Sequence, residues 1–299
     1  MPTPTPTSSA LGHALLIVGD RWNLQIIRGV FAGAHRFQHL RDSLHISDTV
    51  LAHRLGHLVS DGILVAVQYS TAPPRSEYRL TAAGKGLWPV YVALWNWDRS
   101  WSPRAHQELG ARLRHSPCDN TIVPIFGCGA CGAIGLTARD VRTEVDARLL
   151  LDVADRRGRR TTAPPDVNST GVLADRWSTF LLAAALNGTR RFTDFQEQLG
   201  AISPATLTQR LSRFVDGAML DRVPVADGAR RQEYRLTLKG IDFFPVFATL
   251  NTWSQEHLAL DGQSGLSLIH RACGAELRPR YTCNACNVEL TRREIQFER

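Results

Sequence analysis

Two patterns of histidine and cysteine have the spacing of metal ligands. Each reads H-x2-C-x9-C-x2-C, and the two sets are His115, Cys118, Cys128 and Cys131, and His270, Cys273, Cys283 and Cys286. Two thiolates separated by two residues hold one metal ion, and a second pair from a neighbouring turn completes a tetrahedron. We therefore expect two structural Zn²⁺ sites, one for each set, with no open coordination position for catalysis.

The cysteines leave other interpretations open. They could form disulfides, lie as ordinary buried thiols, or act as a redox switch that releases zinc. A side chain other than His115 or His270 could also be the fourth ligand. Residues 1–9 have neither a basic segment nor a long apolar one, so we expect a short disordered tail rather than a signal peptide. The resulting cytoplasmic location disfavours disulfides.

The composition is that of a globular protein. The chain has 299 residues, a net charge of +7 and 43% hydrophobic residues. These values exclude a mostly disordered chain, a collagen-like chain and a small disulfide scaffold. No apolar run approaches the roughly 18 residues of a membrane span, so no membrane partner is expected. The length favours two domains.

The sequence repeats itself at an offset of 155 or 156 residues. Glu77 to Thr81 recurs intact at Glu233 to Thr237, and Arg21-Trp22 recurs at Arg176-Trp177. Shorter matches keep the same order along both halves. The chain is therefore a tandem duplication, with repeat 1 spanning about 10–144 and repeat 2 about 165–299.

Each repeat is expected to consist of a larger, mainly helical domain and a small cysteine-containing ribbon. The expected boundaries are a tail at 1–9, the first winged helix-turn-helix at 10–108, its zinc-ribbon-like extension at 109–148, a linker at 149–165, the second winged helix-turn-helix at 166–262 and its extension at 263–299. The fold class is thus mainly α, with small β-hairpin wings. Arginines in the linker could follow DNA phosphates or simply be solvated.

Helix signals in repeat 1 give the order of a helix-turn-helix. Apolar residues recur at helical spacing over 11–22 and 24–31, and a short helix begins at Arg36. Ser47 is placed to cap the next helix, and Ser203-Pro204 is the matching start in repeat 2. Strands at 63–69 and 77–80, joined by a stiff loop at 70–76, would form the wing. A long helix follows Thr81 and should kink or break at Pro89.

Aromatic residues gather in this last helix and in its counterpart. Trp88, Trp97 and Trp253 are among them. They could line an effector pocket, or pack at a helix–helix or subunit interface.

These pieces together resemble the HxlR family of bacterial winged-helix transcription regulators. The resemblance is carried by Gly19-Asp20-Arg21-Trp22, Arg36-Phe37, Ile46-Ser47, Arg54-Leu55, and Glu77 to Thr81 with Gly84. It covers about 90 residues of each repeat and implies a winged helix-turn-helix, a dimer formed through terminal helices, and repressor or activator activity. Some family members carry an oxidant-sensing cysteine near the start of the domain. Ser9 and Pro164 stand there, so the sequence does not predict thiol sensing by that route.

Exposed polar residues of the capped helices and wings are the expected DNA contacts. They are Ser47, Asp48, Thr49, His53, Arg54, His57, Arg75, Ser203, Thr206, Thr208, Gln209, Arg210, Arg213, Arg230 and Arg231. Gln209 suits adenine and Arg210 suits guanine by their bidentate groups. Any of these residues could instead be a solvated surface group, and Arg54 and Arg210 could make internal ion pairs.

The sequence thus favours a DNA-binding transcription regulator with two structural zinc sites, double-stranded DNA as its partner and no enzymatic activity. Two domains in one chain could pair as an intrachain pseudo-dimer or form a homodimer. The alternatives are an adaptor whose ribbons contact a protein such as polymerase, and a redox- or zinc-responsive switch.

Overall fold

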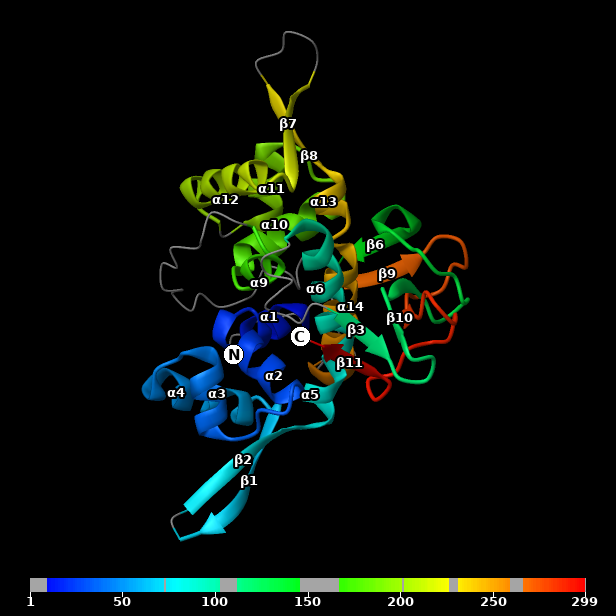
Figure 1. The fold of residues 1–299 in the computed structure, drawn as a ribbon. Coiled ribbons are helices and arrows are strands. Elements are labelled where there is room, and N and C mark those ends of the chain that lie inside the picture. Colours follow the sequence, from blue (N-terminus) through cyan, green and yellow to red (C-terminus); the bar gives the residue numbers. More distant parts are fainter. Residues whose placement is uncertain are drawn as a thin grey trace, which may run out of the picture.

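Each repeat folds into a helix-turn-helix with a β-hairpin wing, followed by short strands (Figure 1). The computed structural model describes residues 10–72, 74–102, 112–145, 167–200, 202–225, 231–258 and 266–298. The expected tail at 1–9 and linker at 149–165 lie outside the described residues. The predicted fold class is confirmed: the chain is mainly helical, with small hairpins and a cysteine-rich extension in each repeat.

Repeat 1 contains the first set of elements. They are α1 (Ala10–Val18), α2 (Arg21–Phe31), α3 (Phe37–Leu44), α4 (Asp48–Ser60), β1 (Leu64–Thr71), β2 (Pro74–Leu80), α5 (Ala82–Gly86), α6 (Trp88–Trp101), β3 (Arg112–His115), β4 (Asn120–Thr121), β5 (Ile125–Cys128), the 3₁₀-helix η1 (Ala138–Asp140) and β6 (Val141–Val145). The recognition helix of this repeat is α4, because it follows the tight turn after α3.

Repeat 2 gives the same order, except that its described residues form no counterpart of β4 or η1. Its elements are α9 (Ser169–Leu173), α10 (Arg176–Leu186), α11 (Phe192–Leu199), α12 (Pro204–Asp216), β7 (Leu220–Pro224), β8 (Gln232–Leu236), α13 (Leu238–Ile241), α14 (Phe244–Leu258), β9 (Leu266–His270), β10 (Pro279–Thr282) and β11 (Ile295–Glu298). Its recognition helix is α12.

Asp20 begins α2 and explains why the helical pattern at 11–22 is interrupted. The Oδ1 atom of Asp20 accepts hydrogen bonds from the backbone amides of Trp22 at 2.9 Å and Asn23 at 3.2 Å. The preceding Gly19 has no room for a side chain, since a Cβ there would lie 2.1 Å from the carbonyl oxygen of Leu15. The chain therefore turns at this point instead of continuing as one helix.

The predicted break at Pro89 is present. Thr81 caps the short helix α5, with its hydroxyl accepting a hydrogen bond from the Gly84 amide at 3.1 Å. The chain then turns at Leu87, and Pro89 lies in the first turn of α6, where its missing amide hydrogen costs nothing.

The wing of repeat 1 is longer than the sequence pattern predicted. Its strands pair in antiparallel register from Leu64↔Leu80 to Thr71↔Pro74, with an irregularity between Gln68 and Ser70. Residues expected in a loop are therefore mostly paired, because the bulge absorbs the mismatch and ladder pairing continues to the tip.

The strands of the two extensions pair with each other across the repeats. In repeat 1, β3, β5 and β6 pair antiparallel with β11, β10 and β9 of repeat 2, respectively. The strands β5 and β10 occupy equivalent positions in the two repeats, as do β3 and β9, and β6 and β11. The pairing is thus reciprocal, and neither extension is an independent ribbon.

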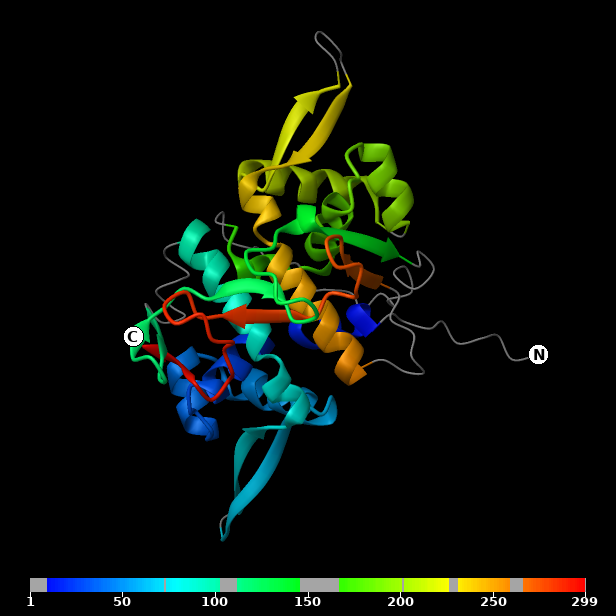
Figure 2. The same ribbon diagram turned by 90° about the vertical axis from the view of Figure 1, so that its right-hand side faces the viewer.

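The helices also alternate between the repeats. In the middle of the molecule α6 lies beside α14, and α1 packs on α14 while α9 packs on α6 (Figures 1 and 2). The indole of Trp97 donates a hydrogen bond to the Lys239 carbonyl at 3.0 Å, and that of Trp253 donates to the Ala83 carbonyl at 2.8 Å. The two bonds join equivalent positions: the first runs from repeat 1 to repeat 2, and the second from repeat 2 to repeat 1. Together with one continuous hydrophobic core, they describe an intrachain pseudo-two-fold arrangement.

The central aromatic residues serve this interface. Trp95, Trp97 and Trp253 are buried, and the ring of Trp97 meets that of Phe243 edge to face at 5.5 Å between centroids. Packing is thus confirmed for these residues, while a cavity of about 230 Å³ is left beside Trp101 and Tyr281.

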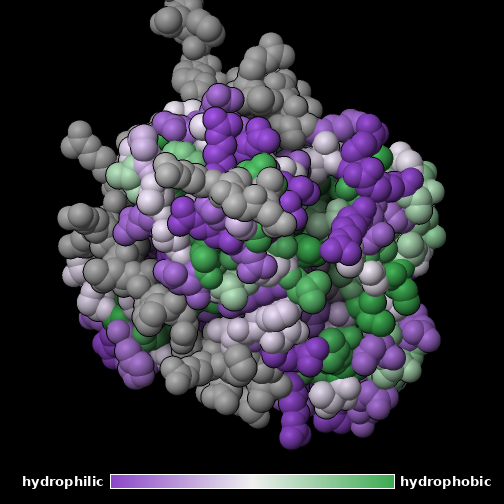
Figure 3. All heavy atoms as spheres, turned by 90° about the horizontal axis from the view of Figure 1, so that it is seen from above, coloured by the Kyte–Doolittle hydropathy of each residue, from purple (hydrophilic) through white to green (hydrophobic). Residues whose placement is uncertain are grey.

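The two wings extend from opposite ends of the molecule. The recognition helices α4 and α12 lie on one side of the central helices, and the strands of the extensions lie on the other (Figure 1). Viewed from the repeat 2 end, the coloured surface is largely hydrophilic, with hydrophobic patches between (Figure 3). Among the described helices, none combines the length and apolar character that a membrane span requires.

Candidate metal centres and nucleic-acid interface

The eight predicted metal ligands come together in two groups of four, but each group draws on both repeats. Centre A, as we call it, consists of His115, Cys118, Cys283 and Cys286, and centre B consists of Cys128, Cys131, His270 and Cys273. The ligand atoms of each group lie within 4.8 Å of one another. The expectation that each repeat holds its own site is therefore wrong, although two groups of three cysteines and one histidine are present.

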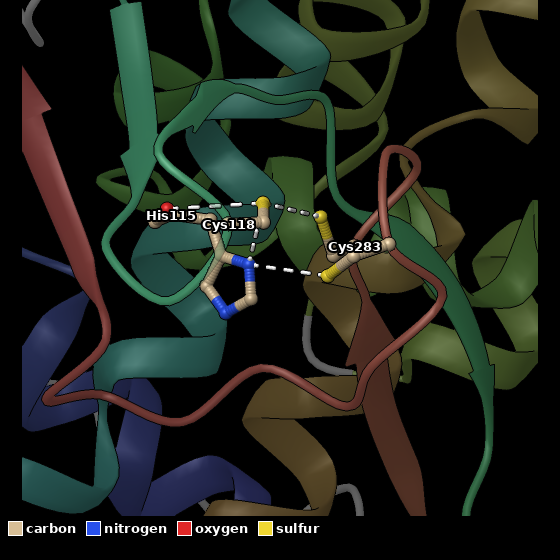
Figure 4. Close-up of side chains that lie close together, drawn as sticks. His115, Cys118 and Cys283 are labelled. Atoms are coloured by element: carbon tan, nitrogen blue, oxygen red, sulfur yellow. Dashed lines mark hydrogen bonds between the residues drawn. The ribbon is translucent and has the colours of Figure 1, made fainter.

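Centre A joins the turn after β3 to the turn after β10. The Nδ1 atom of His115 lies 3.2 Å from Cys118 Sγ and 3.5 Å from Cys286 Sγ, and the sulfurs of Cys118 and Cys283 are 3.8 Å apart. The imidazole and the sulfurs face a common point between two segments that are far apart in the sequence (Figure 4). His115 and Cys283 are buried, and the other two ligands are partly exposed.

Centre B is the pseudo-symmetric counterpart. The Nδ1 atom of His270 lies 3.2 Å from Cys273 Sγ and 3.4 Å from Cys131 Sγ. Here Cys131 and Cys273 are exposed, whereas Cys128 and His270 are buried. The ligand set is the same as in centre A, but its outer side is more open to solvent.

The strand pairing causes this exchange. Pairing of β5 with β10 places Cys128 directly opposite Pro279, and the two C-x2-C turns then lie at opposite ends of one two-stranded ladder. Each turn meets the H-x2-C turn of the other repeat, because β3 and β9 also pair with strands of the opposite repeat.

The surroundings of centre A favour a thiolate. Burial alone raises the pKa of the Cys118 thiol, but hydrogen bonds from the backbone and side chain of Asn120 and from His115 lower it to about 6. At neutral pH this sulfur is in the form that binds metal ions.

The recognition helix of repeat 1 presents a polar outer face. Leu51, Leu55 and Leu58 are buried beneath it. Ser47, Asp48, Thr49, His53 and His57 are exposed on it. His53 and His57 contact each other, with 3.2 Å between their Nε2 atoms. Ser47 is at the cap position but makes no side-chain cap bond.

The recognition helix of repeat 2 has a different outer face. Ser203, Thr208 and Gln209 are exposed, whereas Thr206, Arg210 and Arg213 are partly buried. The Ser203 hydroxyl accepts a hydrogen bond from the Thr206 amide at 3.2 Å, which makes it a true cap. Burial lowers the pKa of Arg213 from its ordinary value.

Two of the predicted contact arginines are paired inside their own repeats. Arg54 Nη2 lies 2.8 Å from Asp20 Oδ2, and the guanidinium of Arg210 contacts the carboxylate of Asp175. Internal ion pairing is thus the alternative that holds for both arginines. Their partners Asp20 and Asp175 were not predicted, although both stand directly before the repeated Arg-Trp pair.

The wing residues are only partly described. Arg75 and Arg231 are exposed near the tips of their hairpins. Arg230 lies outside the described residues.

The two helix-turn-helix regions match one known family. The HxlR-like helix-turn-helix family matches residues 17–106 and 172–261, which is more than half of the chain. The transcriptional regulator Rv3095 of Mycobacterium tuberculosis is 40% identical over 135 residues, covering 45% of this chain and 84% of Rv3095. YtfH of Escherichia coli, also an HTH-type transcriptional regulator, is 34% identical over 93 residues, covering 31% of this chain and 71% of YtfH.

A solved structure, that of PA1607, has 28% identity and a TM-score of 0.39, and the match covers 47% of this chain and 96% of PA1607. Rv3095 corresponds in length to about one repeat, because most of it aligns with less than half of this chain. The two matches to one family at the repeat spacing confirm the duplication, and the chain belongs to the HxlR-like helix-turn-helix family of DNA-binding transcription regulators.

Proposed function

We propose that this protein regulates transcription by sequence-specific binding to operator DNA, and that one chain reads two unlike half-sites. The observation that carries the proposal is the placement of two recognition helices, α4 and α12, on the same side of a pseudo-two-fold body (Figure 1). Recognition helices paired in this way bind two half-sites whose symmetry follows that of the protein.

The two half-sites differ because the reading faces differ. His53 and His57 of α4 stand at the positions of Gln209 and Arg213 of α12. A glutamine amide can make two hydrogen bonds to adenine, which the histidines cannot copy. The remaining exposed residues of both helices, together with Arg75, Arg230 and Arg231 of the wings, would contact bases and phosphates.

Arg54 and Arg210 have a different role in this proposal. Their ion pairs with Asp20 and Asp175 tie the recognition helices α4 and α12 to the starts of α2 and α10, respectively. We assign Arg54 and Arg210 to holding the orientation of the recognition helices. Only a guanidinium nitrogen that is not used in the ion pair could contact a base.

Zinc is the metal that suits the two centres. Bonds of about 2.3 Å to sulfur and about 2.0 Å to nitrogen in a tetrahedron give separations of about 3.8 Å between sulfurs and about 3.5 Å between sulfur and nitrogen. The separations in centre A are 3.8 Å and 3.2–3.5 Å. Four protein ligands leave no open position, so the ions would be structural. They would join the two repeats, and no catalytic role is proposed.

The partner is thus double-stranded DNA, and we place the protein in the bacterial cytoplasm, where operators are accessible and thiols stay reduced. The pseudo-two-fold contacts within one chain supply the interface that a homodimer would otherwise form between two. We therefore propose that a single chain is the DNA-binding unit.

Selection of bound sequences from random DNA with the zinc-loaded chain tests the proposal. We expect an imperfect palindrome bound by one chain, with affinity that falls steeply as salt increases. A perfect palindrome bound by two chains would overturn the pseudo-dimer. If the selection enriched no sequence, sequence-specific DNA binding would be overturned. An adaptor role for the extensions would then be favoured.

A further inference from the structure

Two histidines on the recognition helix of repeat 1 form a pair that neither metal centre uses. His53 and His57 are four residues apart on α4, so they lie on the same face of the helix. Their rings are 4.4 Å apart between centroids and inclined by 67°, and their Nε2 atoms are 3.2 Å apart. Both side chains are exposed.

The separation of the two nitrogens is the one that a shared metal ion needs. With bonds of about 2.0–2.1 Å and an angle between about 90° and 110°, two imidazole nitrogens on one ion lie about 2.9–3.4 Å apart. The 3.2 Å between the Nε2 atoms falls inside this interval. No movement of α4 is therefore needed to bring the two nitrogens to the separation that one ion requires.

The same positions in repeat 2 cannot form such a site. Gln209 and Arg213 replace the two histidines, and a guanidinium is a cation without a free lone pair. Within the described part of the chain, no third histidine, cysteine or carboxylate joins His53 and His57 in a ligand group. Water would complete the coordination, since the pair faces solvent.

We propose that His53 and His57 bind one divalent transition-metal ion through their Nε2 atoms, and that this ion reduces DNA reading by repeat 1. The proposed effect of the ion on DNA reading rests on the proposed function. Nitrogens bonded to a metal ion can no longer exchange hydrogen bonds with base edges. Because repeat 2 lacks the pair, the ion would act on one half-site and leave the other unchanged.

Equilibrium dialysis of the full chain against Zn²⁺ alone tests the metal site without DNA. We expect two tightly bound ions at centres A and B and a third, weaker one. His53→Ala and His57→Ala should each lose the third ion and keep the first two. His39→Ala, which removes an exposed histidine from the neighbouring helix α3, should keep all three. A wild-type chain with no third ion, or a third ion that survives both substitutions, would overturn the site.

Titration of zinc onto the DNA complex tests whether the ion reduces DNA reading by repeat 1. With an operator chosen at low free zinc, added zinc should lower the affinity of the wild type by more than that of His57→Ala. Equal losses would mean that zinc acts elsewhere, which overturns the effect on DNA reading. If the chain binds no DNA at any zinc concentration, the proposed function fails, while the dialysis result still decides the metal site.

Discussion

The two repeats keep the same internal contacts but differ on the faces that point outward. Three contacts occur in both repeats. They are the ion pair between the recognition-helix arginine and an aspartate, the threonine cap before the long helix, and the tryptophan indole bond to the other repeat. The outer residues of α4 and α12 differ at most positions. The contacts that recur are those that build one repeat or join it to the other.

This difference separates assembly from recognition. Contacts that build or join the repeats tend to recur, because the pseudo-two-fold arrangement brings equivalent positions together twice. A residue that reads DNA need not recur when one chain meets two unlike half-sites. The comparison therefore assigns recurring polar pairs to structure and differing exposed pairs to specificity.

The largest effect should come from breaking the exchange of metal ligands. Cys118→Ser with Cys283→Ser damages only centre A and should leave one tightly bound zinc ion per chain. Cys118→Ser with Cys128→Ser, a change of the same size, damages both centres and should leave none. Native mass spectrometry after dialysis against a chelator counts the ions. Sites assembled within each repeat would give the opposite counts.

The first of these variants should still unfold later than the second on heating. Metal binding to cysteine sites supplies several kcal/mol of folding free energy. Each centre also connects the two repeats, so losing both removes two links between them. Equal midpoints for the two variants would contradict this role.

The exchange itself could not be predicted from the sequence. The spacing of His115, Cys118, Cys128 and Cys131 is the same whether these residues meet one another or their counterparts. Which strands pair depends on how the α6 and α14 helices cross, and that is a long-range property. In contrast, the duplication, the cap at Thr81 and the break at Pro89 depend on local residue types and were predicted correctly, whereas the cap bond expected at Ser47 is absent.

The recognition helices show the same limit. Their position followed from the short turn and the spacing of buried leucines, which are local. The pairing of Arg54 with Asp20 depends on two helices meeting at a particular angle, so the sequence could only leave it as an alternative.

A second test concerns a contact that only one side of the molecule has. Ser169 donates from its hydroxyl to Asp98 Oδ2 at 2.5 Å and from its amide to Asp98 Oδ1 at 3.0 Å, and both residues are buried. The equivalent positions hold Ala14 and Ser254. Ser169→Ala should lower the free energy of unfolding by about 1–3 kcal/mol, because it removes a hydrogen bond from a buried carboxylate.

Urea denaturation measures this loss, with Ser100→Ala as the control. Ser100 is exposed, so its substitution should change the stability by less than about 0.5 kcal/mol. Equal effects of the two substitutions would show that the contact between the repeats adds nothing to stability.

A third test separates reading from positioning on α12. Gln209→Ala should cost about 1–3 kcal/mol of discrimination at one base pair and leave thermal stability nearly unchanged. Arg210→Ala should reduce stability and weaken binding to all sequences alike, because it removes the guanidinium that contacts Asp175. Fluorescence anisotropy with single-base operator variants distinguishes them. If Arg210→Ala lost affinity only for operators with a particular base pair, Arg210 would be a base-contacting residue.

The smallest expected difference lies at the helix starts. Ser203 accepts a hydrogen bond from the Thr206 amide at 3.2 Å, whereas Ser47 makes no side-chain cap bond. Ser203→Ala should therefore lower the free energy of unfolding by about 1 kcal/mol, the usual loss for a helix cap. Ser47→Ala should cost less, since only the intrinsic preference of the position is lost. Urea denaturation of both variants provides the comparison, and a larger loss at Ser47 would mean that its hydroxyl caps α4 in solution.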